Sequence, residues 1–304
     1  MDCSVQRSIT VLLAVRNEAV NLPRCLSALS FAKQVVVLDS ASTDDTCEIA
    51  RRWGAEVVQF VYRGGYPKKR QWALEHFPID TQWVLLLDAD EVVPDALWKE
   101  IEQAIAQPDA PDAFLITKGF HFLGRRMRYG GFSHSAVLLF QTGKARFERL
   151  FEDVVDGLDM EIHERVIVDG TIGQLTTPLI HEDFKGLEAY IARHNKYSTW
   201  EARLRHAYLT TGRYGEETIQ PRLFGNPQER RRFLKALIIR LPFEHWLWFT
   251  WQYIVRLGFL EGYPGFIACQ IRASYIAQVR AKIYELRTST DRLSREDINH
   301  YRNI

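Results

Sequence analysis

The sequence predicts an α/β protein with a mainly parallel sheet flanked by helices, followed by a helical C-terminal extension. Two observations carry this prediction. Short apolar runs rich in β-branched residues alternate with helical patterns in the first 90 residues, and the periodicity is helical from residue 187 onward. The runs cover 9–15, 34–39, 56–61 and 83–88, and the helical patterns cover 22–29, 43–53 and 68–76. Runs in which apolar and polar residues do not alternate are typical of parallel strands buried on both faces. Helices connect such strands in right-handed crossovers.

Charge divides the chain into two parts, which we expect to be a catalytic domain (1–185) and a helical, basic and aromatic region (186–304). The 304 residues carry a net charge of +1 and are 46% hydrophobic, enough for a substantial core. The first part has a net charge of −7 and the second of +8. This asymmetry suggests two different tasks.

The cysteines and the lack of long apolar runs suggest a cytoplasmic protein. Cys3, Cys25, Cys47 and Cys269 are scattered, without metal-site spacing, which favours reduced thiols. No signal-peptide pattern opens the chain, and no run reaches the roughly 18 apolar residues that cross a bilayer. We therefore expect membrane contact, if present, to be peripheral, at the inner face of the cytoplasmic membrane.

Polar residues follow three of the predicted strands: Arg16-Asn17-Glu18, Asp39-Ser40 and Asp88-Ala89-Asp90. Ligands bind beyond the carboxyl ends of parallel strands, so these clusters predict one site. Asp88 and Asp90 could share a Mg²⁺ or Mn²⁺ ion, since carboxylates are ligands that hard cations prefer. A solvated turn is the alternative.

A basic cluster, Lys68-Lys69-Arg70, stands at the start of the third predicted helix. Cations are unfavourable at a helix N-terminus, so a bound anion such as a diphosphate would explain them. A solvated helix face is the alternative.

Three ordered motifs resemble family 2 glycosyltransferases, which have the GT-A fold: "VLLAVRNEAVNLPRCLSAL", "VVVLDSASTDDTCEIA" and "WVLLLDADEVVP". Later segments such as "HERVIVDG" and "LIHEDF" are similar to bacterial lipopolysaccharide-core glucosyltransferases. The resemblance implies an inverting, metal-dependent transfer of a sugar, with glucose from UDP-glucose as the expected donor. The implied acceptor is a glycan or lipid-linked glycan of the cell envelope.

The resemblance also implies roles for single residues. The nucleotide sugar would contact Arg16, Asn17, Glu18, Asp39, Lys68, Lys69, Asp88, Ala89 and Asp90, with Asp39 at the base. Asp90, Asp88 and His181 would bind the metal, although Asp39 could instead cap its strand and His181 could be structural. For the general base that deprotonates the acceptor, the best match is Glu164 in "EIHERV". Glu161, Asp153 and Asp156 are alternatives.

Two further segments are candidates for contacts with other molecules. Residues 125–134, with Gly130-Gly131, Tyr129 and Phe132, could form a mobile acceptor loop, and His163 could contact the acceptor. Residues 230–266 combine arginines with tryptophans, which is typical of a membrane-surface segment. Packing inside the protein or in an oligomer is the alternative, and nucleic acid is not expected because no known reading module is present.

Two other functions compete with the transferase. A scaffold that binds nucleotide sugars or membranes would have a degenerate site. A nucleotidyltransferase would need a glycine-rich phosphate loop after the first strand, which the sequence lacks.

Overall fold

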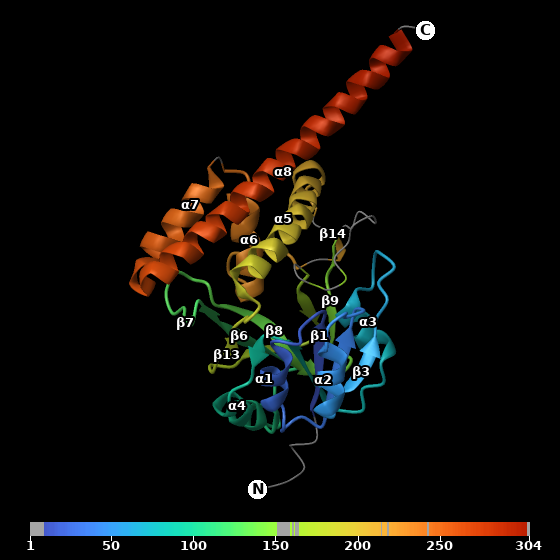
Figure 1. Ribbon diagram of the computed structural model, residues 1–304, viewed down its shortest axis with the longest axis vertical. Coiled ribbons are helices and arrows are strands. Elements are labelled where there is room, and N and C mark those ends of the chain that lie inside the picture. Colours follow the sequence, from blue (N-terminus) through green and yellow to red (C-terminus); the bar gives the residue numbers. More distant parts are fainter. Residues whose placement is uncertain are drawn as a thin grey trace.

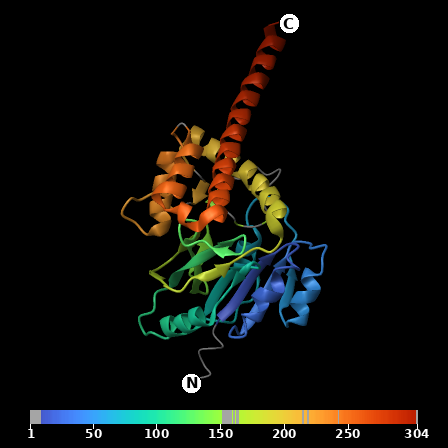
Figure 2. The same ribbon diagram turned by 60° about the vertical axis from the view of Figure 1, so that its left-hand side comes forward.

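The computed structural model describes residues 9–150, 159, 161, 164–213, 215–217, 219–241 and 243–302. An α/β body forms one end of the molecule, and helices from the second half of the chain lie across the other end (Figures 1 and 2). This arrangement confirms the predicted fold class.

The main sheet has the strand order β3-β2-β1-β4-β8-β6-β13-β5. The four strands β1–β4 run parallel, β8 is antiparallel to both neighbours, and β13 is parallel to β6. The sheet is built from β1 (Ile9–Val15), β2 (Gln34–Asp39), β3 (Glu56–Gln59), β4 (Trp83–Asp88), β5 (Glu91–Val92), β6 (Ala113–Phe122), β8 (His134–Gln141) and β13 (Leu179–His181). Strands β7 (Arg125–Arg126) and β12 (Ile172–Gln174) each pair with β6 as well.

Four short strands form two further pairs outside this sheet. Both pairs are antiparallel: β9 (Ala145–Phe147) with β11 (Val166–Val168), and β10 (Arg149–Leu150) with β14 (Gly215–Glu217).

The helices of the α/β body are α1 (Leu22–Ser27), α2 (Thr46–Arg52), α3 (Lys69–His76) and α4 (Asp95–Ile105). They cover the sheet so that β1 is buried along its whole length, which explains its unbroken apolar sequence. Strands β1, β2 and β4 have the predicted bounds. Strand β3 ends two residues before the predicted end at residue 61. The last hydrogen bond to β2 runs from Phe60 N–H to Asp39 O, and the chain then leaves the sheet, so that Val61 is 73% exposed.

The C-terminal region consists of α5 (Gly186–Thr211), α6 (Pro227–Ile238), α7 (Glu244–Thr250), a π-helical turn (Trp251–Val255), a 3₁₀ turn (Gly258–Glu261) and α8 (Gly262–Arg302). Helix α5 packs along α8 around Ala202, Ile276 and Val279. A buried ionic network joins α5 to α7, because Arg205 binds both Glu201 and Glu244 at 2.8 Å. Within the described residues, no helix is both long and apolar enough to cross a bilayer.

Candidate active site

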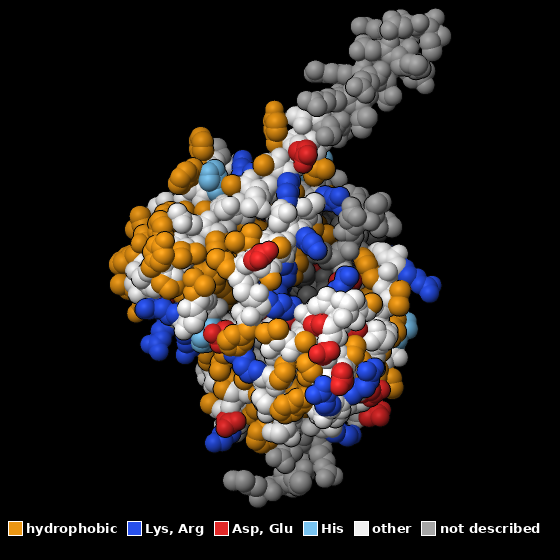
Figure 3. All heavy atoms as spheres, viewed as in Figure 1, with side chains coloured by type: hydrophobic (Ala, Val, Ile, Leu, Met, Phe, Trp, Pro, Cys, Tyr) orange, Lys and Arg blue, Asp and Glu red, His pale blue; other side chains and the backbone are white. Residues whose placement is uncertain are grey.

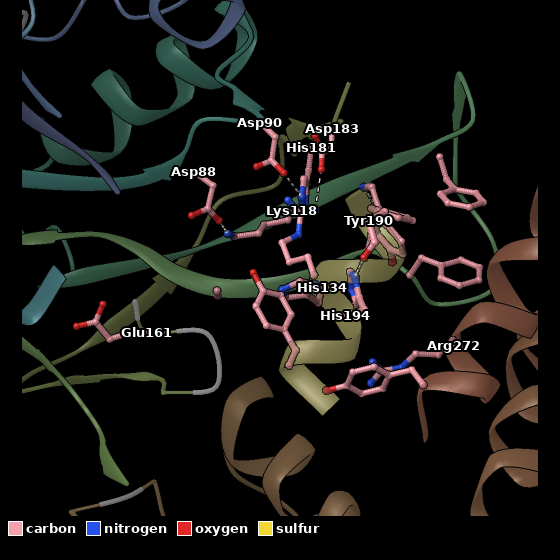
Figure 4. Close-up of a pocket in the computed structure, with 18 of the residues that line it drawn as sticks. Asp88, Asp90, Lys118, His134, Glu161, His181, Asp183, Tyr190, His194 and Arg272 are labelled. Atoms are coloured by element: carbon pink, nitrogen blue, oxygen red, sulfur yellow. Dashed lines mark hydrogen bonds and ion pairs between the residues drawn. The ribbon is translucent and has the colours of Figure 1, made fainter. Parts of the chain in front are cut away.

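A cavity of about 1440 Å³ lies between the carboxyl ends of the parallel strands and the C-terminal helices. Its walls come from β1, β4, β13, the segment 120–138 and helices α5, α6 and α8. Figure 4 shows Asp88, Asp90 and His181 at one end of the cavity and Arg272 at the other. Of the three predicted polar clusters, those after β1 and β4 line this cavity, and Asp39-Ser40 after β2 does not.

Asp88 ends β4 and is held by two cations. One of its carboxylate oxygens pairs with the guanidinium of Arg70, and the other accepts from Lys118 Nζ at 2.9 Å. Burial alone would raise the pKa of Asp88, but the charges of Lys118 and Arg70 outweigh it and hold the pKa far below its usual range. Asp88 is therefore ionised, and both of its oxygens are bound within the chain.

Asp90 faces His181 across the turn that follows β4. His181 Nε2 lies 3.3 Å from Asp90 Oδ2, because β13 pairs with β5 and brings His181 opposite Glu91. Although burial opposes its protonated form, the charge of Asp90 raises the pKa of His181 to about 9. Tertiary structure thus brings together two of the three predicted metal ligands.

The loop after β1 is fixed by side chains of the neighbouring loop. Asn17 has a positive φ of 54°, its N–H donates to Ser42 Oγ at 2.8 Å, and its Oδ1 accepts from Thr43 N–H. Glu18 accepts from Lys185 Nζ at 2.5 Å. Arg16, Asn17, Glu18 and Ala89 all line the cavity.

Asp39 lies behind this loop and does not line the cavity. Its side chain is buried, and it accepts from Ser42 and from Gln59 Nε2 at 3.0 Å. Burial alone would raise the pKa of Asp39, but the hydrogen bonds from Ser42 lower it below the usual value. This geometry agrees with the strand-end cap, the alternative to base recognition.

The basic cluster at α3 is paired with acids of the same chain. Lys68 pairs with Glu164, whereas Lys69 donates to Val15 O at 2.8 Å and lines the cavity. Glu161 accepts from the backbone N–H groups of Arg70 and Gln71 at 3.0 and 2.9 Å. The carboxylate of Glu161 thus takes the position at the helix N-terminus where the sequence predicts a substrate anion.

Glu164, the predicted base, lines the cavity but is 7% exposed and shares its carboxylate with Lys68. Its alternative Glu161 also lines the cavity, and burial raises the pKa of its carboxyl. Asp153, Asp156 and His163 lie outside the described residues.

Several cavity residues were not predicted from the sequence. Lys118 interrupts the apolar run of β6, a signal that could have identified it, since a lysine there needs a buried partner. His134 of β8 and Arg165 before β11 were also not predicted. Further unpredicted side chains come from helices whose position the sequence does not give: Tyr190, Arg193, His194, Arg231, Arg272 and Tyr275.

The segment 125–134 is anchored to the C-terminal region. Glu261 is 2% exposed, and its Oε1 accepts from the N–H groups of Arg128 and Tyr129 at 2.5 and 2.7 Å. Gly130 and Phe132 line the cavity, whereas Tyr129 does not. The segment therefore borders the cavity and is anchored at Glu261, and its role as an acceptor loop stays a prediction.

The sequence is similar to known glycosyltransferases. Residues 10–158 match the family model described as glycosyl transferase family 2. The chain is 25% identical over 293 residues to the lipopolysaccharide core biosynthesis glycosyltransferase LpsC of Rhizobium meliloti, covering 91% of this chain and 92% of LpsC. It is also 24% identical over 288 residues to an uncharacterized glycosyltransferase of Rickettsia typhi, covering 92% of this chain and 88% of the relative.

Among the solved structures that are similar to this chain, one matches most of it and another matches less than half of it. A mannosyltransferase from Pyrobaculum calidifontis, in complex with GDP-Man and Mn²⁺, is 18% identical, with a TM-score of 0.48, covering 91% of this chain and 87% of that one. Glucosyl-3-phosphoglycerate synthase from Mycobacterium tuberculosis, with Mn²⁺ and UDP, is 24% identical, with a TM-score of 0.32. That match covers 40% of this chain and 47% of the synthase, less than half of its length.

Proposed function

Because the chain belongs to glycosyl transferase family 2, we propose that its cavity binds a UDP-sugar, with UDP-glucose as the expected donor, and a Mg²⁺ or Mn²⁺ ion. The sugar would pass with inversion to a glycan or lipid-linked glycan in envelope polysaccharide or lipopolysaccharide synthesis. The observation that carries the proposal is the pairing of Asp90 with His181 beside Asp88 in the cavity. The similarity to LpsC supports the acceptor class.

The donor set fits a divalent cation with two protein ligands. Asp90 offers a carboxylate, and His181 offers an imidazole nitrogen once the metal displaces the proton that Asp90 stabilises, a combination suited to Mn²⁺ and tolerable for Mg²⁺. Within the described part of the chain, no three His, Cys, Asp or Glu side chains form a complete metal site, so substrate oxygens would supply further ligands. When bound, such a cation stabilises the charge on a departing diphosphate.

The chain's own cations would hold and orient the diphosphate. Lys69 lines the cavity next to Val15 at the end of β1, and Lys118 and Arg70 stand at Asp88. A diphosphate could attract these groups because ammonium and guanidinium donors bind phosphate oxygens strongly. Arg16, Asn17 and Glu18 border the same end of the cavity, where we place the nucleoside.

Glu164 would take the proton from the acceptor hydroxyl, as one displacement with inversion requires one general base. To do so, the carboxylate of Glu164 must either accept from the acceptor hydroxyl while it remains paired with Lys68, or rotate away from Lys68. Glu161 remains an alternative, although its two oxygens already accept backbone hydrogen bonds.

An aromatic patch supports contact with a membrane that carries the acceptor. We define it as the exposed apolar side chains of residues 241–263: Leu241, Phe243, Trp246, Leu247, Trp251, Ile254, Val255, Leu257, Phe259, Leu260 and Tyr263. Figure 3 shows hydrophobic side chains gathered over α7 and the start of α8. Both acids in this range, Glu244 and Glu261, are buried, so the patch exposes no carboxylate. An aromatic surface that contains the exposed Arg256 and is flanked by the exposed Arg125, Arg126 and Arg128 suits an anionic lipid surface.

The test is thermal stabilisation by UDP, UDP-sugars and GDP-sugars, first with Mn²⁺ and then with EDTA. We expect stabilisation by one UDP-sugar that needs Mn²⁺, and slow metal-dependent hydrolysis of that donor. Asp90→Asn and His181→Ala should each weaken metal-dependent donor binding about 100-fold. Asp109→Asn, at an exposed position, is the matched control. If folded protein binds no nucleotide, a scaffold with a degenerate site replaces the transferase proposal.

A further inference from the structure

Three arginines of the cavity wall have no acidic partner. Arg165, Arg231 and Arg272 line the cavity, and no carboxylate of the described residues forms an ion pair or hydrogen bond with any of their guanidinium groups. They come from the segment before β11, from α6 and from α8, so tertiary structure alone brings them together.

Several other cations of the same cavity are neutralised within the chain. Lys118 pairs with Asp88 and Glu91, and Arg193 lies 2.7 Å from Asp183. Deeper in the helical region, carboxylates likewise bind the cations: Arg205 with Glu201 and Glu244, Arg232 with Glu148, and Lys235 with Glu201. Arg16, Lys196 and Arg256 also line the cavity without such an ion pair among the described residues. Arg165, Arg231 and Arg272 are distinguished by their proximity, because the charges of Arg165 and Arg272 act on Arg231.

Their charges act on one another. The Arg231 side chain is exposed to solvent in the cavity but has protein atoms around it, and this environment together with the charges of Arg165 and Arg272 lowers its pKa to about 10. Burial, followed by the charges of Arg231 and Arg165, lowers the pKa of His134 well below its usual value. Three like charges in a partly enclosed cavity cost free energy, which an anion would recover.

The three arginines lie beyond the residues to which we assign the donor. His134 pairs in register with Lys118, which binds Asp88, so His134 separates the carboxylate end of the cavity from the arginines. In Figure 4 Arg272 lies at the far end from Asp90, with Tyr190 and His194 between them. Arg272 also stacks on Tyr275, its Cζ 5.0 Å from the ring centroid. Such rings offer faces on which sugar can stack.

We propose that Arg165, Arg231 and Arg272 form a subsite for an oxyanion, phosphate or carboxylate, carried by the saccharide acceptor. This inference rests on the proposed function, because it takes the other end of the cavity as the donor site. Planar guanidinium groups match both anions through paired hydrogen bonds. The acceptor is accordingly a phosphorylated or acidic glycan rather than a neutral one.

Calorimetric titration tests the subsite with three probes: glucose 6-phosphate, glucuronic acid and glucose. Each is titrated into the full-length protein saturated with UDP and Mn²⁺, so that the donor site is filled. We expect one or both anionic sugars to bind and glucose to bind at least about tenfold more weakly. Comparison of the two anionic probes tells phosphate from carboxylate.

Variants separate the subsite from the donor site. Arg231→Gln with Arg272→Gln should weaken the anionic probe about 10- to 100-fold and leave UDP binding unchanged. Arg51→Gln, an exposed arginine of α2, should change neither. Equal binding of all three probes, or an anion displaced by UDP, would overturn the subsite. If UDP itself fails to bind, the titration without UDP still tests the arginines, so the two proposals fail separately.

Discussion

Lys68 and Glu164 form an ion pair in the interior, with only 2% and 4% of their side chains exposed. The ammonium of Lys68 also lies 4.8 Å from the centroid of the Trp200 ring. The pair connects the N-terminus of α3 with the segment that leads to β11 and with helix α5. A residue predicted from sequence as the base thus also stabilises the contact between the two parts of the chain.

Substitution of Glu164 separates these two roles. Glu164→Gln removes the ion pair between the buried Lys68 and Glu164, so we expect the free energy of unfolding to fall by about 3 kcal/mol. If Glu164 is also the base, the rate of hydrolysis of the bound UDP-sugar should fall by about 10²- to 10⁴-fold, because general base catalysis is lost. The Kd of the donor should not change.

Lys68→Met provides the comparison, because it breaks the same ion pair and leaves the carboxylate. Hydrolysis per folded molecule should survive in Lys68→Met if catalysis needs only the carboxylate. Equal losses of hydrolysis in both variants would mean that the pair acts through structure, and Glu161→Gln would then be measured as the alternative base.

The sequence predicts what depends on local pattern and misses what depends on distant packing. Strands β1, β2 and β4 match their predicted bounds because a buried parallel strand is a continuous apolar run. Asp90 is predicted as a site residue from its place after a strand and His181 only from the resemblance to family 2 glycosyltransferases, and the structure places the two side chains 3.3 Å apart. No pattern links Glu161 to the N-terminus of α3 or Arg231 to Arg272, since these contacts exist only once the helices dock.

Glu261 should control the order of the segment 125–134. Glu261→Ala removes an acceptor shared by the N–H groups of Arg128 and Tyr129 and the partner of Arg125 Nε. We expect a loss of about 2–4 kcal/mol in stability and faster amide exchange at residues 128 and 129. Glu261→Gln keeps an acceptor oxygen and should have a smaller effect, and the exposed Glu285→Ala should have none. Unchanged exchange in Glu261→Ala would show that the segment holds its place without this carboxylate.

Glu100 should make stability depend on acidic pH. It accepts from Thr176 N–H, Thr176 Oγ1 and Thr177 N–H at 2.7–2.8 Å, which fixes α4 to the turn before β13 and His181. Burial alone would raise the pKa of Glu100, but these hydrogen bonds lower it from 4.5 to about 2. Between these values the unfolded chain binds a proton that the folded chain does not, so the free energy of unfolding falls as the pH falls through the window.

Glu100→Gln tests this dependence by denaturant titration at several pH values. We expect it to cost about 1–2 kcal/mol at neutral pH and to flatten the loss of stability between pH 4.5 and 2. Glu102→Gln, on the same helix, is the control. An identical pH profile in wild type and Glu100→Gln would contradict the hydrogen-bonded carboxylate.

The aromatic patch should bind anionic membranes through its tryptophans. Trp246 and Trp251 are 62% and 49% exposed, and each would bury a large apolar surface at a lipid interface. In vesicle flotation we expect binding to phosphatidylcholine with phosphatidylglycerol, weaker binding to phosphatidylcholine alone, and loss at high salt. Replacing both tryptophans by serine should weaken binding by about tenfold or more. Trp53→Ser, which replaces a tryptophan 52% exposed beside α2, is the matched control and should bind as the wild type does.

The outcome that would contradict membrane binding is a wild type that does not bind vesicles and instead forms a dimer, which the double substitution dissociates. The patch would then be an interface between two copies of the chain, because the second copy would cover the apolar side chains that are exposed in one copy.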